Sequence, residues 1–179
     1  MIEAGTRIPA LTWEEVSDPD LLQVLENAER LSTPKPAWYL TLAHNPEMAK
    51  GYAAYWDLTH RGGRVEHTVK ELMRIVIAKF LDCDFCADQR SVLALEQGLD
   101  ESQVAMCSRP DFEHPDPRTR AALRFARALT LDTSDDSLFD KVYADLHEVF
   151  DEAEIIELGC FAAIAIGGVK LSRSLRIKP

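Results

Sequence analysis

Helical periodicity is the feature of this sequence that most restricts its fold. In the segment 18–31, apolar residues recur every three or four positions, as they do along one face of an α-helix. Further segments with helical patterns are 37–45, 46–60, 68–82, 87–98, 100–107, 118–131, 135–150 and 151–175. No convincing strand or hairpin pattern separates them. The sequence therefore predicts an all-α fold of helical hairpins.

Two of these segments begin with a capping-box pattern. Thr68 and Glu71 have the T-x-x-E spacing, and Asp100 and Gln103 repeat it in a related form. Glu71 thus has a structural interpretation, as a residue that caps its own helix, beside any catalytic one. Three prolines in 108–117 predict a long loop there.

Length and composition predict one domain. The chain has 179 residues, of which 46% are hydrophobic, so it can bury its own core. We expect a single domain over 1–179, with about the first 35 residues forming an extension that packs on the core. A formal net charge of −10 repels polyanions, so neither nucleic acid nor a membrane is an expected partner.

The sequence also predicts a cytoplasmic protein. Its first fifteen residues are neither basic nor followed by an apolar stretch, unlike a signal peptide. The longest apolar run, 160–169, is too short to cross a bilayer and indicates a buried helix. Four cysteines in such a chain do not suggest a framework of structural disulfides.

The segment 81–91 contains a CxxC pair, Cys83 and Cys86, with Arg90 four residues further on. A thiol attacks only as its thiolate, and a helix N-terminus or a nearby cation favours that form. If a helix begins near Asp82, both thiols lie in its first turn and Arg90 shares a face with Cys86. The CxxC spacing also lets one sulfur resolve an oxidised form of the other.

Two other interpretations of the cysteines remain open. A zinc site needs about four ligands, and the candidates are Cys83, Cys86, Cys107, His114 and Cys160. The pair can also be two unreactive thiols on a helix. A thioredoxin-like pair is disfavoured because that motif needs a βαβ frame, which the sequence does not offer.

The segment 71–104 resembles the core motif of the carboxymuconolactone decarboxylase and alkylhydroperoxidase D (AhpD) superfamily. That motif has a glutamate, a CxxC twelve residues later and a histidine four residues after the second cysteine. Glu71, Cys83 and Cys86 match it, as does the segment 98–100. The C-terminal segment 151–175 resembles the last long helix of the family, and the likeness covers about 40–175.

The resemblance implies an AhpD-like helical subunit that forms a homo-oligomer, as a dimer, trimer or hexamer. It implies a hydroperoxide reductase in which Cys86 is the nucleophile, Cys83 the resolving thiol and Glu71 part of a proton relay. The redox-active pair would need no other cofactor and no metal, and a protein thiol could donate the electrons. The alternative is a family member without peroxidase activity, either a small-molecule lyase or a non-catalytic oligomeric binding protein.

Arg90 departs from the family pattern because it stands where the histidine is usual. An arginine cannot release its proton near neutral pH, so it cannot relay protons. In two antiparallel helices that fold back at Asp82, Glu71 lies about 16 Å and Arg90 about 12 Å from the hinge. We therefore expect a line from Glu71 through Arg90 to Cys86, in which Arg90 stabilises the thiolate.

The remaining candidates have mainly structural interpretations. His67 could replace the missing relay, but a surface position is expected, and His44 and His60 are expected to cap helices or lie on the surface. Gly167 and Gly168 suggest close helix packing. Cys107 and Cys160 are interpreted as structural. A group of aromatic residues is expected in the core or at a subunit interface, with a pocket wall as the alternative. Its members are Trp38, Tyr39, Tyr52, Tyr55 and Trp56.

Overall fold

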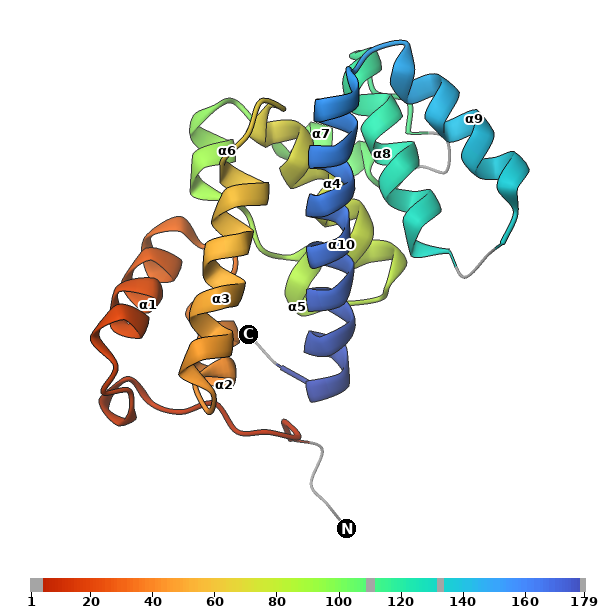
Figure 1. Ribbon diagram of the computed structural model, residues 1–179. Coiled ribbons are helices and arrows are strands. Elements are labelled where there is room, and N and C mark those ends of the chain that lie inside the picture. The colour runs from red at the N-terminus through yellow and green to blue at the C-terminus, as the bar shows by residue number, and fades with distance from the viewer. Residues whose placement is uncertain (1–4, 109–111, 132–133, 178–179) are drawn as a thin grey trace.

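The computed structural model describes residues 5–108, 112–131 and 134–177, and these contain helices and no strand (Figure 1). The expected all-α fold is confirmed. The α-helices are α1 (Pro19–Leu31), α2 (Pro36–Leu42), α3 (Pro46–Trp56), α4 (His67–Phe80), α5 (Asp84–Ala87), α6 (Val92–Glu96), α7 (Glu101–Met106), α8 (Pro117–Thr130), α9 (Asp136–His147) and α10 (Glu152–Leu175). A 3-10 turn, η1 (Trp13–Glu15), precedes α1, and a π-helical turn, η2 (Asp57–Arg61), extends α3.

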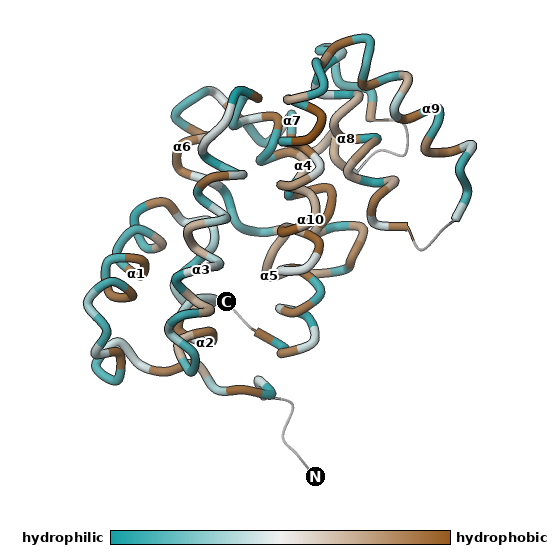
Figure 2. Tube along the Cα trace, in the orientation of Figure 1, coloured by the Kyte–Doolittle hydropathy of each residue, from teal (hydrophilic) through white to brown (hydrophobic). Residues whose placement is uncertain are grey.

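Helix α4 forms the centre of the fold. It packs against α8 and α10 along its length and against α5 at its C-terminal end. Figure 2 shows hydrophobic stretches of α4, α8 and α10 in the middle of the molecule. The fully buried apolar side chains of α4 are Leu72, Met73, Ile75, Val76, Ile77 and Ala78. Because α5 carries the CxxC pair, this core fixes the position of both cysteines.

The N-terminal helices lie at one side of this core. Helix α1 packs against α2, α3 and α6, and α3 contacts α10. Figure 1 shows α1 to α3 on the opposite side of α10 from α8 and α9. The side chains of α2 and α3 can therefore form a wall opposite α5.

Helix α10 is only partly a buried helix, which corrects the interpretation of 160–169. Phe161 and Ala165 are buried, whereas Ala163 and Gly167 are exposed. By length and composition alone, the whole helix could cross a membrane. Here one side of it packs against α4, α8 and η2 instead, as a core helix does. Its other side leaves apolar residues exposed.

The segment after the CxxC pair differs from the expected continuous helix. Helix α5 ends at Ala87, and α6 begins only at Val92. In a continuous helix, the backbone groups between them would bond to one another. Here two buried side chains of α4 are their hydrogen-bond partners instead. Arg74 donates to the carbonyls of Cys86 and Gln89, and Glu71 accepts from a backbone N–H of the same segment. The helix therefore breaks at 88–91.

The two expected capping boxes have different outcomes. Asp100 and Gln103 form the expected box at the start of α7. The box at Thr68 and Glu71 is wrong, because the N-cap residue of α4 is Glu66, two residues before Thr68. The Glu71 side chain is fully buried and lies in an ion pair. In the loop 108–117, residues 109–111 lie outside the described part of the chain.

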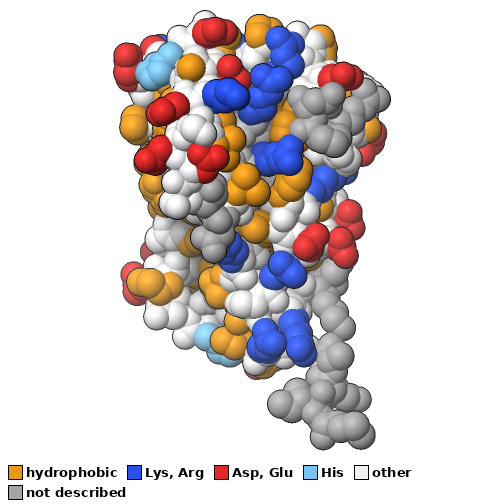
Figure 3. Space-filling model, turned by 90° about the vertical axis from the view of Figure 1, so that its right-hand side faces the viewer, with side chains coloured by type: hydrophobic (Ala, Val, Ile, Leu, Met, Phe, Trp, Pro, Cys, Tyr) orange, Lys and Arg blue, Asp and Glu red, His pale blue; other side chains and the backbone are white. Residues whose placement is uncertain are grey.

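Charge is distributed unevenly over the surface. Figure 3 shows a face on which Lys and Arg side chains form a column among hydrophobic ones, with Asp and Glu nearer the edges. The net charge of −10 therefore does not describe every face of the molecule. A partner can meet a locally basic surface on an acidic protein.

Candidate active site

The CxxC pair lies where the chain folds back from α4. Asp82 has a φ of 50°, which turns the chain before α5. Cys83 is the N-cap residue of α5, and Cys86 lies within it. A disulfide joins the two cysteines, whose Cα atoms are 5.3 Å apart. Both side chains are almost fully buried, so access to them depends on the cavities described below.

A buried ion pair on α4 holds the backbone of this segment. The Arg74 guanidinium donates to both carboxylate oxygens of Glu71, at 2.9 Å each. It also donates to the backbone carbonyl of Cys86 and, at 2.6 Å, to that of Gln89. Such bidentate pairs fix geometry as well as charge. Arg74 therefore connects the central helix directly to the CxxC segment.

Two buried histidines complete the network around Glu71. His60 Nε2 lies 3.1 Å from Glu71 Oε2. His67 Nδ1 lies 2.9 Å from the carbonyl oxygen of His60, and its Nε2 lies 2.8 Å from the Ser91 hydroxyl. Both histidines are buried, so the surface position expected for His67 and the capping or surface role expected for His60 are wrong. His44 is exposed, as expected, and contacts the carbonyl of Pro9.

The protonation states follow from burial and from the ion pair. Burial by itself would raise the pKa of Glu71, but the charge of Arg74 and the hydrogen bond from His60 lower that pKa below its ordinary value. Burial lowers the pKa of His60 to about 4, although the neighbouring Glu71 acts in the opposite direction. At neutral pH, the site thus holds an ionised Glu71 and a neutral His60.

The expected line from Glu71 through Arg90 to Cys86 is wrong. Arg90 forms a two-pronged ion pair with Glu101, with N–O distances of 2.8 and 3.2 Å, on the partly exposed side of the segment. The position beside Glu71 belongs to Arg74. The prediction assumed a continuous helix from Cys86 to Arg90. Because the helix breaks at 88–91, Arg90 pairs with Glu101 instead of Glu71.

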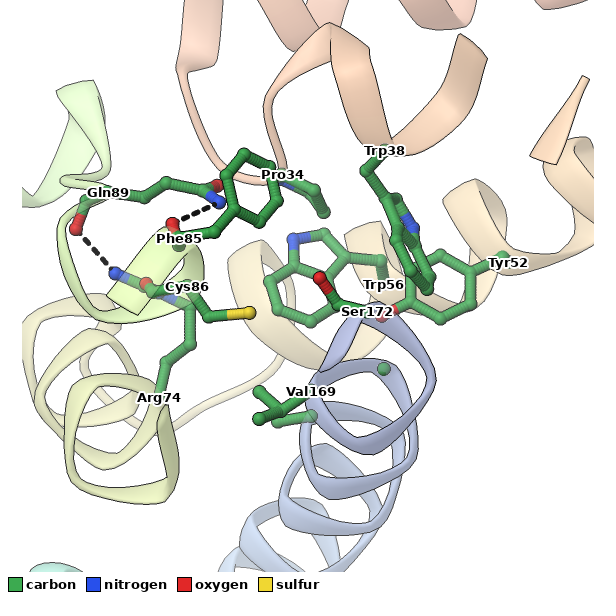
Figure 4. A pocket seen from close by; sticks show the side chains of 12 residues that line it. Pro34, Trp38, Tyr52, Trp56, Arg74, Phe85, Cys86, Gln89, Val169 and Ser172 are labelled. Atoms are coloured by element: carbon green, nitrogen blue, oxygen red, sulfur yellow. Dashed lines mark hydrogen bonds between the residues drawn. The ribbon is translucent and has the colours of Figure 1, made fainter. Parts of the chain in front are cut away.

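An aromatic pocket lies between α2, α3, α5 and α10, with Cys86 on its wall (Figure 4). It encloses about 390 Å³ of empty space, counting the part open to solvent. Figure 4 shows the Cys86 sulfur pointing from α5 toward the aromatic side chains. The lining residues are Pro34, Trp38, Tyr52, Trp56, Arg74, Phe85, Cys86, Gln89, Ala165, Gly168, Val169 and Ser172.

Three members of the expected aromatic group form one wall of this pocket. The Tyr52 ring centroid lies 5.1 Å from that of Trp38 and 6.0 Å from that of Trp56. A Cβ atom at Gly168 would lie 2.3 Å from the Tyr52 hydroxyl oxygen, so a larger residue there would force Tyr52 to move. These rings belong to the buried core or pack against it and also line the pocket, so the core and pocket-wall interpretations both hold for them. Tyr39 is buried away from this pocket, and Tyr55 is exposed beside Cys160.

A second cavity reaches the other sulfur. It is an open groove with about 690 Å³ of empty space, again counting the open part. Cys83 lines this groove, whereas Cys86 lines the aromatic pocket, and Phe85 and Ser172 line both cavities. The groove is lined by Asp82, Cys83, Asp84, Phe85, Asp88, Ser172, Arg173, Arg176 and Ile177. The two cysteines are therefore approached from different sides.

The other two cysteines lie outside this arrangement. Cys107 is buried, its sulfur lies 3.8 Å from the carbonyl of Leu72, and burial raises its pKa to about 12. Cys160 is half-buried beside Tyr55. Within the described ranges, no three His, Cys, Asp or Glu side chains form a group that could hold a metal ion. The five zinc candidates are thus not gathered into one site.

Comparison with protein families identifies the segment that carries the site. Residues 46–128 match the model of the carboxymuconolactone decarboxylase family. This segment is a carboxymuconolactone decarboxylase family domain. It contains Glu71, Arg74, Cys83 and Cys86, so the family resemblance of the motif is confirmed. No protein with a curated description gives a significant match to the chain.

Solved structures show the same fold. A variant of the debrominase Bmp8 in complex with 2,3,4-tribromopyrrole is similar, with 20% identity, a TM-score of 0.80, and coverage of 98% of this chain and 92% of that one. The AhpD core of a peroxidase-related protein from Ralstonia eutropha JMP134 has 19% identity, a TM-score of 0.73, and coverage of 97% and 92%. A peroxidase-related protein from Silicibacter sp. TM1040 has 14% identity, a TM-score of 0.73, and coverage of 99% and 95%. The expected AhpD-like fold is confirmed.

Sequence reasoning missed three polar residues of the site. Arg74 lies three positions after Glu71, on the same side of a mostly apolar helix, and this spacing could have revealed it. His60 is brought to Glu71 by the π-helical turn η2, for which the sequence gives no simple signal. Ser172 lines the pocket from the opposite end of the chain, so only the tertiary structure reveals it.

Proposed function

We propose that this carboxymuconolactone decarboxylase family protein is a thiol oxidoreductase that reduces an organic hydroperoxide with the Cys83–Cys86 pair. The observation that carries the proposal is a disulfide-forming pair in which Cys86 lines a mostly apolar pocket. A pocket with aromatic walls suits the organic part of a hydroperoxide. The AhpD-like fold, shared with two peroxidase-related proteins, supports the same assignment.

The proposed reaction starts from the reduced protein. The Cys86 thiolate attacks the terminal oxygen of ROOH, an S–O bond forms, and the O–O bond breaks. The leaving RO⁻ takes a proton and departs as ROH, and Cys86 becomes a sulfenic acid. The Cys83 thiolate then attacks the Cys86 sulfur, which forms the disulfide and releases hydroxide, protonated to water. The pair supplies both electrons, so no other redox group is needed.

In this proposal, Glu71 and Arg74 are positioning residues. Because Arg74 lowers the pKa of Glu71, this carboxylate stays ionised and is a poor proton donor at neutral pH. Its role is to orient Arg74, which holds the carbonyl of Cys86. Arg90 acts differently from the sequence prediction, since Glu101 already balances its charge.

The electron donor is proposed to approach through the groove at Cys83. A dithiol that attacks the Cys83 sulfur would release Cys86 as a thiolate toward the aromatic pocket. The mixed charges of Asp84, Asp88 and Arg173 suit a protein thiol donor with polar surroundings. Such a cycle needs a reducing compartment, which agrees with the cytoplasm as the proposed location.

We also propose that the protein is a homo-oligomer. Exposed apolar side chains extend along α3 and η2, at Met48, Tyr55 and Leu58, and along α10, at Ile156 and Leu171. Because these elements contact one another, we propose that the residues contribute to one subunit interface. Light scattering after gel filtration would test this, and Ile156→Asp should lower the mass to that of one chain.

A second candidate function is reductive debromination of an aromatic ring. The aromatic walls around Cys86 favour it, and so does the shared fold with a debrominase solved with a brominated pyrrole. The Cys86 thiolate would attack bromine, and the carbon would keep the bonding electrons and take a proton. Cys83 would then form the disulfide and release bromide. Bromide release from a polybrominated pyrrole by the reduced protein tests this candidate.

The deciding experiment is a single turnover of the fully reduced protein with cumene hydroperoxide. We expect loss of one peroxide for each Cys83–Cys86 disulfide, located by peptide mass spectrometry. Cys86→Ser should slow peroxide loss by at least about 100-fold, because it removes the nucleophile. Cys83→Ser should leave a Cys86 sulfenic acid that dimedone labels.

Cys160→Ser is the matched control, because Cys160 lies outside both cavities. It should react as the wild type does. A Cys86→Ser protein that reduces the peroxide within twofold of the wild-type rate would refute the proposed function. So would a disulfide that forms at any other pair of cysteines.

A further inference from the structure

The aromatic pocket contains three buried polar atoms without a hydrogen-bond partner. They are Nε1 of Trp38, Nε1 of Trp56 and the hydroxyl oxygen of Ser172. The three side chains are only 3%, 4% and 2% exposed, and all of them line the pocket. Buried polar groups are normally paired, so three unpaired ones around a single cavity require an explanation.

The chemistry of these atoms specifies what is missing. An indole nitrogen can only donate a hydrogen bond, and a serine hydroxyl can donate one as well. Trp38 and Trp56 come from α2 and α3, and Ser172 comes from α10, so the three side chains line the cavity from separate elements (Figure 4). The missing partner is therefore a hydrogen-bond acceptor inside the pocket.

Arg74 and Gln89, the cation and the amide on the wall, are already engaged, whereas the uncharged Tyr52 hydroxyl also lines the pocket. The charge of Arg74 is balanced by Glu71. The Gln89 side chain donates to the carbonyl of Phe85 and accepts from the backbone N–H of Lys35. The rest of the lining is aromatic or aliphatic. Such a wall disfavours a ligand that carries a full charge, because a buried charge needs a partner.

We propose, as a refinement of the proposed function, that the pocket selects neutral apolar substrates with a hydrogen-bond acceptor at the end that reacts. The donors of Trp38, Trp56 and Ser172 hold that acceptor beside Cys86. In a hydroperoxide, the acceptor is the pair of peroxide oxygens. When the O–O bond breaks, negative charge develops on the leaving alkoxide, and donors already aimed at it stabilise that charge.

The test uses the oxidised protein, which cannot turn over, and two probes of similar shape. Acetophenone carries a carbonyl acceptor, and ethylbenzene carries no polar atom. We expect acetophenone to bind about 3- to 10-fold more tightly, the effect of a net gain of one hydrogen bond. Ser172→Ala should reduce this preference, whereas Ser174→Ala should leave it unchanged, because Ser174 lies on the same helix but is exposed.

A second readout needs no variant. The chain has three tryptophans, and each gives one indole N–H signal in a ¹H–¹⁵N spectrum. Acetophenone should move the signals of Trp38 and Trp56 downfield, while Trp13, which lies outside the pocket, serves as the internal reference. Ethylbenzene should not produce this downfield shift.

Equal affinity for the two probes, or Trp38 and Trp56 signals that acetophenone leaves in place, would overturn the proposal. Trapped water would then be the partner of the three donors. The outcome is independent of the turnover experiment. Selective binding without peroxide reduction would support this inference and refute the proposed function, and peroxide reduction without selective binding would do the reverse.

Discussion

Substitution of Arg74 by methionine should strongly destabilise the protein. The side chain of Arg74 is 4% exposed and that of Glu71 is fully buried, so their charges compensate each other away from water. Methionine has a similar length and no charge, and it leaves the Glu71 carboxylate buried without its cation. Removal of one partner of a buried ion pair typically costs about 3–5 kcal/mol. The carbonyls of Cys86 and Gln89 also lose their donor.

Urea unfolding at pH 7 measures this loss as a decrease in the free energy of unfolding. The double variant Glu71→Gln/Arg74→Met should recover at least about 2 kcal/mol of it, because no charge then remains buried alone. In the wild-type protein, the backbone N–H of Ser91 donates a hydrogen bond to Glu71. Glutamine at position 71 can still accept this hydrogen bond. The comparison thus separates the effect of charge from that of hydrogen bonding.

Arg64→Met provides the control. Arg64 pairs with Asp151 on the surface, with exposures of 61% and 45%, and exposed pairs contribute little. We expect no measurable change in stability for this variant. An Arg74→Met protein that loses less than about 1 kcal/mol, or a double variant no more stable than Arg74→Met, would refute the argument that the buried pair supports the site.

Two further predictions concern pH and helix packing. Burial lowers the pKa of His60 from 6.5 to about 4. Between these two pH values, His60 binds a proton in the unfolded chain but not in the folded one. The free energy of unfolding therefore decreases as the pH falls from 6.5 to about 4. Between pH 7 and pH 4.5 this group accounts for roughly 2 kcal/mol of the free energy of unfolding. His60→Gln should remove that part of the difference between the free energies measured by urea unfolding at the two pH values. Gly168→Ala should lower the melting temperature, because its Cβ would collide with Tyr52, whereas Gly167→Ala has open space and should raise it slightly, since alanine favours a helix. Equal melting temperatures for the two glycine variants would contradict the close approach at Gly168.

Much of the fold was predictable from the sequence because its signals are local. The stripes of 118–131 and 135–150 correspond to α8 and α9, and the Asp100 capping box starts α7 as expected. These patterns depend on contacts within about one helical turn. The position of Cys86 close to the glutamate helix was also anticipated, since the chain folds back at Asp82.

The interior of the site was less predictable because its contacts are not local. The spacing between Cys86 and Arg90 predicts that the two share a helix face, but it does so only in an unbroken helix. The break depends on hydrogen bonds from Arg74, which no local pattern records. His60 and Ser172 reach the site through the packing of α3, η2 and α10, and their burial follows from tertiary structure alone.

The π-helical turn η2 also affects how relatives of this chain should be aligned. An α-helix turns about 100° per residue, and a π-turn accommodates one additional residue without ending the helix. Deletion of a single residue between Trp56 and Gly62 would restore regular winding and rotate the following side chains by about that angle. His60 would then point away from Glu71. In related sequences, the number of residues in this turn, and not only the presence of a histidine, therefore indicates whether the carboxylate has an imidazole partner.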